Sequence, residues 1–146
     1  MTPLPFEKAT VLCDRICAFL LECGPPYGTI TAEVESNILG AIASKQFVIK
    51  IKEGEIRYFA GYFKVKPEHV DLISQRTIPA GYDLFQGSIM YVTEAANKDG
   101  RKGMAEIIRR LRKKATGMQG VFWHRPKHDD KIMWYPRQRG GELHGN

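Results

Sequence analysis

The chain has 146 residues, 43% of them hydrophobic and 10% aromatic, which predicts one globular domain with a single packed core. No segment approaches the length of a membrane span, so the composition excludes a membrane-spanning protein. The formal charge of +6 is uneven, because the residues from Arg101 onward carry 12 Lys and Arg against 4 Asp and Glu. This basic C-terminal part predicts an anionic partner: a phosphorylated cofactor, a nucleic acid or an acidic protein surface.

The three cysteines, Cys13, Cys17 and Cys23, all lie in the first segment of the chain. An odd number of cysteines with none further along argues against a disulfide framework. Cys13 and Cys17 have helical i, i+4 spacing, but no histidine or acidic pair with zinc-site spacing lies nearby, so we expect reduced, buried thiols and no metal site. The N-terminus also lacks a signal-peptide pattern, and we therefore expect a cytoplasmic protein.

The first part of the chain predicts two helices followed by a hairpin. Apolar residues recur every three or four positions over Phe6–Cys23, and a Gly-Pro-Pro sequence ends this helix. A second helix is expected over Thr31–Lys45, with Thr31 as its N-cap. Alternating β-forming residues at Phe47–Lys52 and Glu55–Lys66, joined by a glycine-containing turn, predict a two-stranded hairpin.

The second part predicts a short helix at Pro67–Gln75, where proline suits the first helical turn, and then a strand at Gly87–Ala95. The nearly continuous apolar centre of that strand indicates burial on both faces. An amphipathic helix is expected from Met104 to Lys114, with Gly117 ending it. Two final strands are expected at Gly120–His124 and Lys131–Tyr135. We interpret residues 1–136 as a single domain and residues 137–146 as a flexible basic tail.

The junction between the strand Gly87–Ala95 and the basic helix predicts an anion site. A strand that turns through glycines into a helix directs unpaired amides, and the positive end of the helix dipole, toward one point. Gly100 and Gly103 would let the backbone approach a phosphate, while Arg101 and Lys102 add positive charge at the same place. A diphosphate group suits such a site.

The element order and the run GRKGMA at residues 100–105 resemble the GCN5-related N-acetyltransferase (GNAT) superfamily. That superfamily's acyl-CoA pyrophosphate loop is usually Gln/Arg-x-x-Gly-x-Gly/Ala. Gly103 and Ala105 match this pattern, whereas Gly100 replaces the usual Gln or Arg, and Arg101 is expected to substitute in part. The resemblance covers about Val34–Tyr135 and implies an α+β fold with a mixed, mainly antiparallel sheet flanked by helices.

A weaker likeness is to the toxin-activating lysine acyltransferases, which transfer a fatty acyl group from acyl carrier protein to a lysine of a toxin. The segment Glu35–Phe63 is similar to their helix and following hairpin. That family uses a histidine near the N-terminus and an aspartate on the central strand. This chain has no histidine before His69, and its corresponding strand offers Thr93 and Glu94. The likeness therefore implies a related fold rather than toxin activation.

The GNAT resemblance implies an N-acyltransferase that uses an acyl-CoA or acyl-carrier-protein donor, with acetyl-CoA or a longer acyl-CoA as cofactor and an amine as acceptor. The exposed edge of the central strand, over Tyr91–Ala95, would pair with the pantetheine arm. The implied cofactor-binding residues are Tyr91, Val92, Thr93, Gly100, Arg101, Lys102, Gly103 and Met104.

Three residues are candidates for the catalytic roles that this resemblance implies. Glu94 or His124 would accept the proton of the attacking amine, and Tyr135 would return a proton to the leaving thiolate. Each also has a structural interpretation: Glu94 as a solvated acid at a strand end, His124 as a structural histidine, and Tyr135 as a packing or surface residue.

A binding module is the alternative function. The helix segment 109–114 and the segments 123–128 and 134–139 interleave basic groups with Trp123, Trp134 and Tyr135. This combination can hold phosphates by charge and stack bases on aromatic rings, as in a non-catalytic GNAT-like protein that binds nucleic acid or another anion. A small structural or assembly protein is the third possibility.

Overall fold

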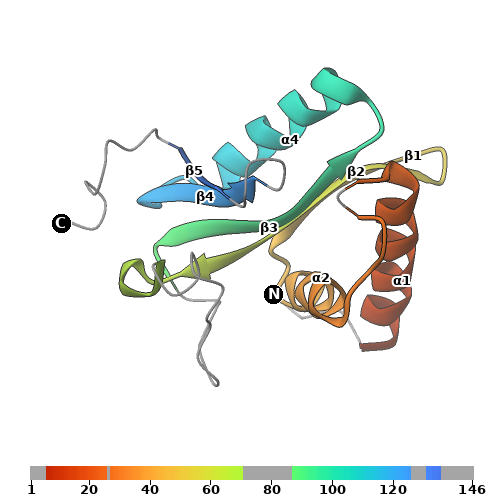
Figure 1. Ribbon diagram of the computed structural model, residues 1–146, viewed down its shortest axis with the longest axis horizontal. Coiled ribbons are helices and arrows are strands. Elements are labelled where there is room, and N and C mark those ends of the chain that lie inside the picture. The colour runs from red at the N-terminus through yellow and green to blue at the C-terminus, as the bar shows by residue number, and fades with distance from the viewer. Residues whose placement is uncertain (1–5, 26, 71–86, 126–130, 136–146) are drawn as a thin grey trace. The chain divides into compact units, whose positions relative to one another are not determined.

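The computed structural model describes residues 6–25, 27–70, 87–125 and 131–135 (Figure 1). In chain order the elements are α1 (Phe6–Cys23), α2 (Ala32–Ala43), β1 (Phe47–Lys52), β2 (Glu55–Val65), the 3-10 helix η1 (Pro67–His69), β3 (Ile89–Asn97), α4 (Gly100–Lys114), β4 (Gly120–Arg125) and β5 (Lys131–Tyr135). The predicted order of helices and strands is thus confirmed. The expected short helix from Pro67 begins as η1, and its continuation from residue 71 lies outside the described residues.

The strands follow one another in the sheet in the order β1-β2-β3-β4-β5. The pairs β1–β2 and β4–β5 are antiparallel, whereas β3 and β4 run parallel. This mixed sheet with its helices confirms the expected α+β class.

The chain forms two compact units, and the long strands β2 and β3 run from one into the other. The first unit comprises Met1–Tyr62 and Thr93–Lys114, and the second comprises Phe63–Val92 and Ala115–Asn146. The single domain expected over residues 1–136 stays a prediction, and the expected tail lies outside the described residues.

In the first unit, α1 and α2 lie side by side and cover one face of the β1–β2 hairpin (Figure 1). Thr31 caps α2 as predicted, since its hydroxyl accepts a hydrogen bond from the Val34 amide at 3.2 Å. The apolar stripe of α1 packs against α2 and the hairpin, which removes it from water and stabilises the unit. The buried core consists of Ala9, Cys13, Ile16, Phe19, Leu20, Ile38, Ile42, Ile56, Phe59 and Ala96.

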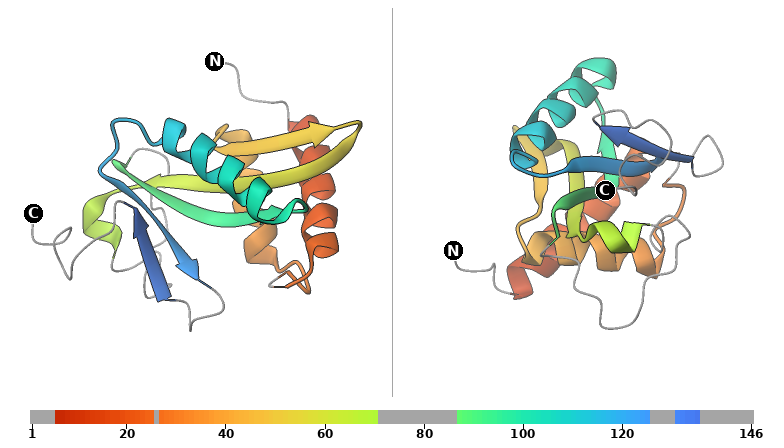
Figure 2. Two further views of the ribbon diagram at one scale, coloured as in Figure 1. Left: turned by 90° about the horizontal axis from the view of Figure 1, so that it is seen from above. Right: turned by 90° about the vertical axis from the view of Figure 1, so that its left-hand side faces the viewer.

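Helix α4 runs alongside the hairpin in the same unit (Figure 2). Its buried residues Gly103, Ile107 and Leu111 recur at helical spacing and form one face. At the edge of that face, the Arg110 guanidinium donates to the Ile49 carbonyl at 2.8 Å and to the Tyr58 hydroxyl at 2.9 Å. These bonds fix α4 on the hairpin.

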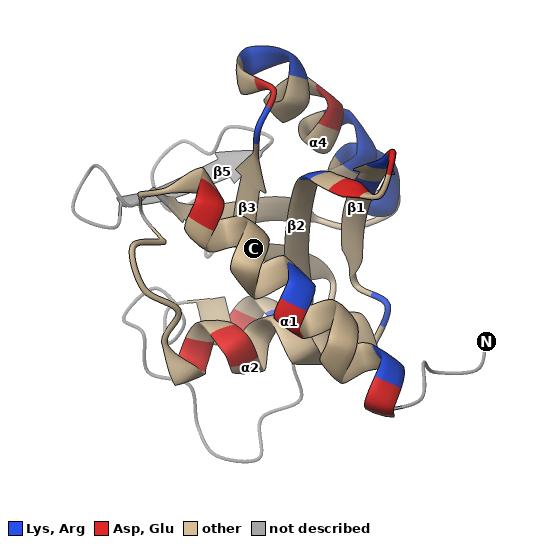
Figure 3. Ribbon diagram, turned by 90° about the vertical axis from the view of Figure 1, so that its right-hand side faces the viewer, with Lys and Arg blue, Asp and Glu red and all other residues tan. Residues whose placement is uncertain are grey.

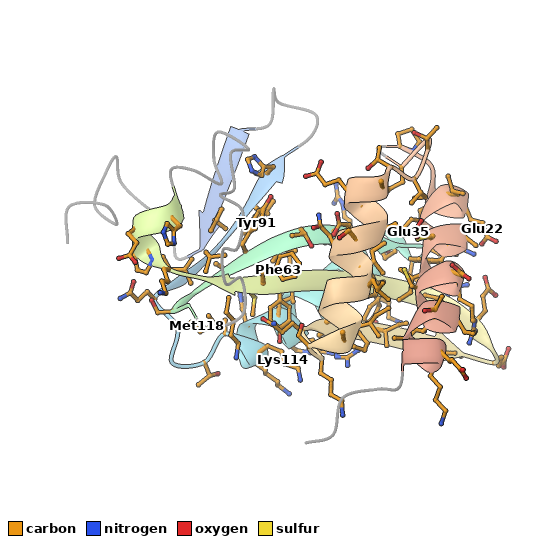
Figure 4. The ribbon with its side chains drawn as sticks, turned by 90° about the horizontal axis from the view of Figure 1, so that it is seen from below. Glu22, Glu35, Phe63, Tyr91, Lys114 and Met118 are labelled. Atoms are coloured by element: carbon orange, nitrogen blue, oxygen red, sulfur yellow. The ribbon has the colours of Figure 1, made fainter. Side chains whose placement is uncertain are left out.

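The second unit contains the start of β3 together with β4 and β5. Ile89 to Val92 pair with Gly120 to Trp123 in parallel. Tyr91, which is labelled in Figure 4, stacks on Phe122 with ring centroids 4.7 Å apart. Gly87 lies so close to β2 that an added Cβ would be 1.8 Å from the Val65 carbonyl carbon, so only glycine fits there.

Among the described residues, no helix combines the length and the apolar composition that crossing a bilayer requires.

Candidate functional site

The turn between β3 and α4 lies entirely in the first unit, and it differs in one respect from the sequence-based expectation. Helix α4 begins at Gly100 rather than Met104, so the predicted glycine turn is the first turn of the helix. The chain changes direction before the helix, at Asn97 to Gly100. There the Asn97 side chain accepts a hydrogen bond from the Asp99 amide at 2.9 Å, and Gly100 adopts a φ of 62°. The apolar periodicity that predicted the start at Met104 reports only the buried face of a helix, not its cap.

The start of α4 offers unpaired backbone donors, as the first turn of any helix does. The Gly103 amide lies 3.5 Å from the Asp99 carbonyl, while the amides of Gly100, Arg101 and Lys102 have no acceptor within the part of the chain that the structure describes. Nothing lies within 4 Å of the position that a Cβ would take at Gly100, and the side chains of Arg101 and Lys102 are exposed. These three amides and two cations fit an anionic group.

A β-bulge holds this turn in place. The pairing of β1 with β2 shifts register between Lys50 and Ile51, which leaves Arg57 as the extra residue of β2. The Arg57 carbonyl accepts a hydrogen bond from the Lys98 amide at 3.0 Å, and its guanidinium forms an ion pair with Asp99. The hydrogen bond and charge of Arg57 lower the pKa of Asp99, so its carboxylate carries a compensated charge beside the open amides of α4.

Gly103 is explained by a contact inside the protein. It is buried, and a Cβ at this position would lie 2.3 Å from the Asn97 side-chain oxygen. The absence of a side chain at Gly103 therefore makes room for Asn97. The backbone that remains open to an anion is that of Gly100 to Lys102.

Glu94 is one of the two buried polar or charged residues in the described part of the chain, and only 5% of its surface is exposed. The alternative of a solvated Glu94 is therefore wrong. Burial raises the pKa of Glu94 from its ordinary value of 4.5 to about 7, and the nearby Thr93 and Asn37 side chains offset part of that increase. Among the described residues, its Oε2 atom has no hydrogen-bond partner.

Helix α2 contributes two polar residues on the side of Glu94. The Asn37 side chain lowers the pKa of Glu94, whereas the negative charge of Glu33 raises it. Glu33 and Asn37 are four residues apart, so they lie on one face of α2. Glu33 is exposed and Asn37 is half-buried, so polar groups extend from the solvent toward the buried carboxyl group of Glu94. The sequence patterns did not identify either residue.

Tyr27, in the loop between α1 and α2, was also missed. Its hydroxyl accepts a hydrogen bond from the Ala95 amide at 3.3 Å. The Lys98 amide points to β2, and amides alternate along a strand, so the Ala95 amide points to the opposite edge of β3. Burial, and then the charge of Glu94, raise the pKa of Tyr27. Tyr27 therefore lies beside Glu94 and covers one amide of the strand edge that was expected to bind pantetheine.

His124 and Tyr135 belong to the second unit, whereas Glu94 belongs to the first. The His124 ring meets the Tyr91 ring edge-on, with centroids 5.8 Å apart, and the backbone of Tyr135 pairs with Val121. The Tyr135 side chain lies outside the described part. The catalytic roles of His124 and Tyr135 stay predictions.

The described pairing of β3 with β4 starts at Ile89 and ends at Val92, which is paired with Trp123. Tyr91 and Val92 are thus already paired along the edge that was expected to be open. Thr93 follows this paired stretch, and its hydroxyl donates to the Gly61 carbonyl at 3.3 Å. The edge that remains for a ligand begins at Thr93.

Within the described residues, no group of three or more His, Cys, Asp or Glu residues is arranged to hold a metal ion. Cys13 is buried, whereas Cys17 and Cys23 are partly exposed, and all three thiols are free. Burial raises the pKa of Cys13 to about 12, so this thiol is a poor nucleophile at neutral pH.

The chain was compared with known proteins at the levels of sequence and structure. No protein-family model matches the sequence, and no curated protein does. Among solved structures, the polyamine N-acetyltransferase of Drosophila melanogaster aligns over 85% of this chain and 74% of its own, with a TM-score of 0.55 and 14% identity. The chain has the fold of an N-acetyltransferase.

Two further structures align with this N-acetyltransferase fold over similar lengths. An N-acetyltransferase from Staphylococcus aureus covers 84% of this chain and 79% of its own, at 10% identity and a TM-score of 0.40. A structure described as an acetyltransferase covers 86% and 79%, at 11% identity and the same TM-score. The GNAT-like fold expected from the resemblance at residues 100–105 is confirmed by the first of the three alignments.

Proposed function

We propose that the protein transfers an acyl group from an acyl-CoA thioester, or from an acyl carrier protein, to an amine. The observation that carries this proposal is the buried Glu94, whose Oε2 has no partner in the described structure and whose pKa is raised to about 7. A carboxyl group with a pKa near neutrality is suited to accept a proton from an amine at physiological pH. The shared fold supports the reaction class, since acyl transfer to amines is what the aligned Drosophila enzyme performs.

The donor would be held through the start of α4 and the edge of β3. The amides of Gly100 to Lys102 and the side chains of Arg101 and Lys102 would hold the diphosphate of coenzyme A. The edge from Thr93 onward would hold the amides of the pantetheine arm. Coenzyme A itself would supply the activated thioester carbonyl.

In the proposed reaction, an unprotonated amine nitrogen of the acceptor forms a bond to the thioester carbonyl carbon while the carbon–sulfur bond breaks. Glu94 accepts the proton that the amine loses. The leaving thiolate takes up a proton from water. The Ala95 amide stays bonded to the Tyr27 hydroxyl, which positions the loop between α1 and α2 beside Glu94.

The proposed acceptor is a small amine that carries a further positive charge. Glu33 and Glu94 place two acidic groups near one another, and a cationic acceptor would balance their mutual repulsion. The aligned Drosophila enzyme is a polyamine N-acetyltransferase that forms N-acetylagmatine. Polyamines and agmatine are therefore the first acceptors to test.

The test is a transfer assay with acetyl-CoA and longer acyl-CoAs, using spermidine, agmatine and an uncharged primary amine as acceptors. We expect kcat to increase with pH through about 7, and Glu94→Gln to lower kcat by about 10² or more. Glu35→Gln, at an exposed position on the same α2 helix as Glu33, is the matched control and should keep its rate. Transfer that is unaffected by Glu94→Gln would refute the role of this carboxyl group.

A further inference from the structure

The solvent-facing side of α4 carries apolar and basic side chains in one continuous stripe. Two of the large hydrophobic side chains that the structure leaves exposed, Met104 at 38% and Ile108 at 43%, lie here one helical turn apart. Arg101 lies three residues before Met104, and Arg112 lies four residues after Ile108, so all four share one side of the helix. We call these residues and the intervening Ala105 the α4 stripe.

Basic residues recur along α4, as the blue segments of its ribbon show in Figure 3. Lys102, Arg109 and Lys113 are exposed, and Glu106 is the one acidic residue of the helix. Glu106 bonds to Lys50 at 3.2 Å, on the side of α4 that meets the hairpin, and it also lies 3.8 Å from the Arg109 guanidinium. One carboxylate shared between two cations leaves α4 with a net positive charge.

Helix α4, which bears the stripe, is bonded to the β1–β2 hairpin. Arg110 bonds to the Ile49 carbonyl and the Tyr58 hydroxyl, and the Lys50–Glu106 pair adds a second link to the hairpin. None of these bonds involves Arg101, Met104 or Ile108. A partner would meet a surface that is already arranged, which lowers the entropy cost of association.

We propose that the α4 stripe docks an acidic helical surface of another protein, in which carboxylates surround an apolar side chain. The carboxylates would pair with Arg101 and with the exposed flanking cations Lys102 and Lys113, while the apolar side chain would cover Met104 and Ile108. A nucleic acid backbone would satisfy the cations but would leave the two apolar side chains without a partner. Insertion into a bilayer surface needs a wider apolar face than two residues.

Binding can be measured by fluorescence anisotropy with three labelled probes and the full chain. The first probe is an acidic helical peptide with Glu and Leu on one face, the second has Ser in place of each Leu, and the third is a DNA duplex. We expect the first probe to bind about tenfold tighter than either of the others at physiological salt.

Variants test the apolar and the basic residues of the α4 surface separately. Ile108→Ser should abolish the preference for the Leu peptide, and Lys102→Gln with Lys113→Gln should weaken the binding of both peptides about tenfold. The matched controls are Val11→Ser and Lys8→Gln on α1, where Val11 is 62% exposed. Circular dichroism and thermal melts verify that each variant is folded.

The outcomes decide the proposal without reference to acyl transfer, because binding is the only readout. Preference for the Leu peptide that is lost in Ile108→Ser but kept in Val11→Ser supports it. Equal binding of the two peptides, tighter binding of the duplex, absence of binding, or an equal loss in the α1 controls would each overturn it.

Discussion

Glu94 shows how far a single residue can be understood from the sequence. Glu94 lies two residues from Val92 and from Ala96 on β3, so all three side chains point to the same face of the strand, and all three are buried. This spacing can be read from the sequence. The same pattern could not show which groups meet it there, because Asn37 and Glu33 come from α2 and Tyr27 from the preceding loop. Contacts between residues so distant in sequence depend on the tertiary structure.

Burial of Glu94 also predicts a pH-dependent stability. Because the folded carboxyl binds its proton more tightly than the unfolded one, the free energy of unfolding falls as pH rises from about 4.5 to above 7. The Glu94→Gln variant has no carboxyl group at this position, so its free energy of unfolding should not show this decrease with pH. Between pH 5 and pH 8, wild type should lose about 2 kcal/mol more than the variant in urea denaturation. Parallel curves for the two proteins would show that Glu94 is not desolvated.

Gly103 predicts a second residue-scale effect. Gly103→Ala places a methyl group where the Asn97 side-chain oxygen lies, so it should destabilise the protein by about 1–3 kcal/mol despite the higher helix propensity of alanine. In a double-mutant cycle with Asn97→Ala, the two losses should be strongly non-additive. Additive losses, measured by thermal or chemical unfolding, would contradict this contact.

At the scale of elements, the sequence predicted α1, α2 and the hairpin well because each has a local signal: periodicity, an N-cap or a glycine turn. The bulge at Arg57 had no such signal, since β-forming residues alternate through it without interruption. The start of α4 was placed late for a similar reason, because the turn at Asn97 and Asp99 and the first helical residue Gly100 lie outside the apolar repeat.

Attachment of α4 to the hairpin is the element-scale prediction. Arg110→Ala removes hydrogen bonds to Ile49 and Tyr58 and leaves the carbonyl without its donor, so it should cost about 1–3 kcal/mol. Lys113→Ala, on the exposed side of the same helix, should cost less than about 0.5 kcal/mol. Equal costs would contradict the observed orientation of α4.

At the scale of the whole molecule, the element order and the short motif at residues 100–105 predicted the N-acetyltransferase fold that the structural alignment confirms. The motif was less informative about its own residues. Gly103 accommodates Asn97, whereas the open amides are those of Gly100 to Lys102. A one-dimensional pattern records which residue types occur, but it does not separate those that pack from those that bind.

The central claim is that the start of α4 holds the diphosphate of coenzyme A, and calorimetric titration with coenzyme A and acetyl-CoA tests it most directly. Arg101→Glu with Lys102→Glu should reduce the affinity by at least about tenfold, since two cations beside the open amides become anions. Arg112→Glu with Lys113→Glu makes the same change of charge at the other end of the helix, and it should retain most of the affinity. Equal losses in both pairs, or no binding by the wild-type protein, would contradict the account.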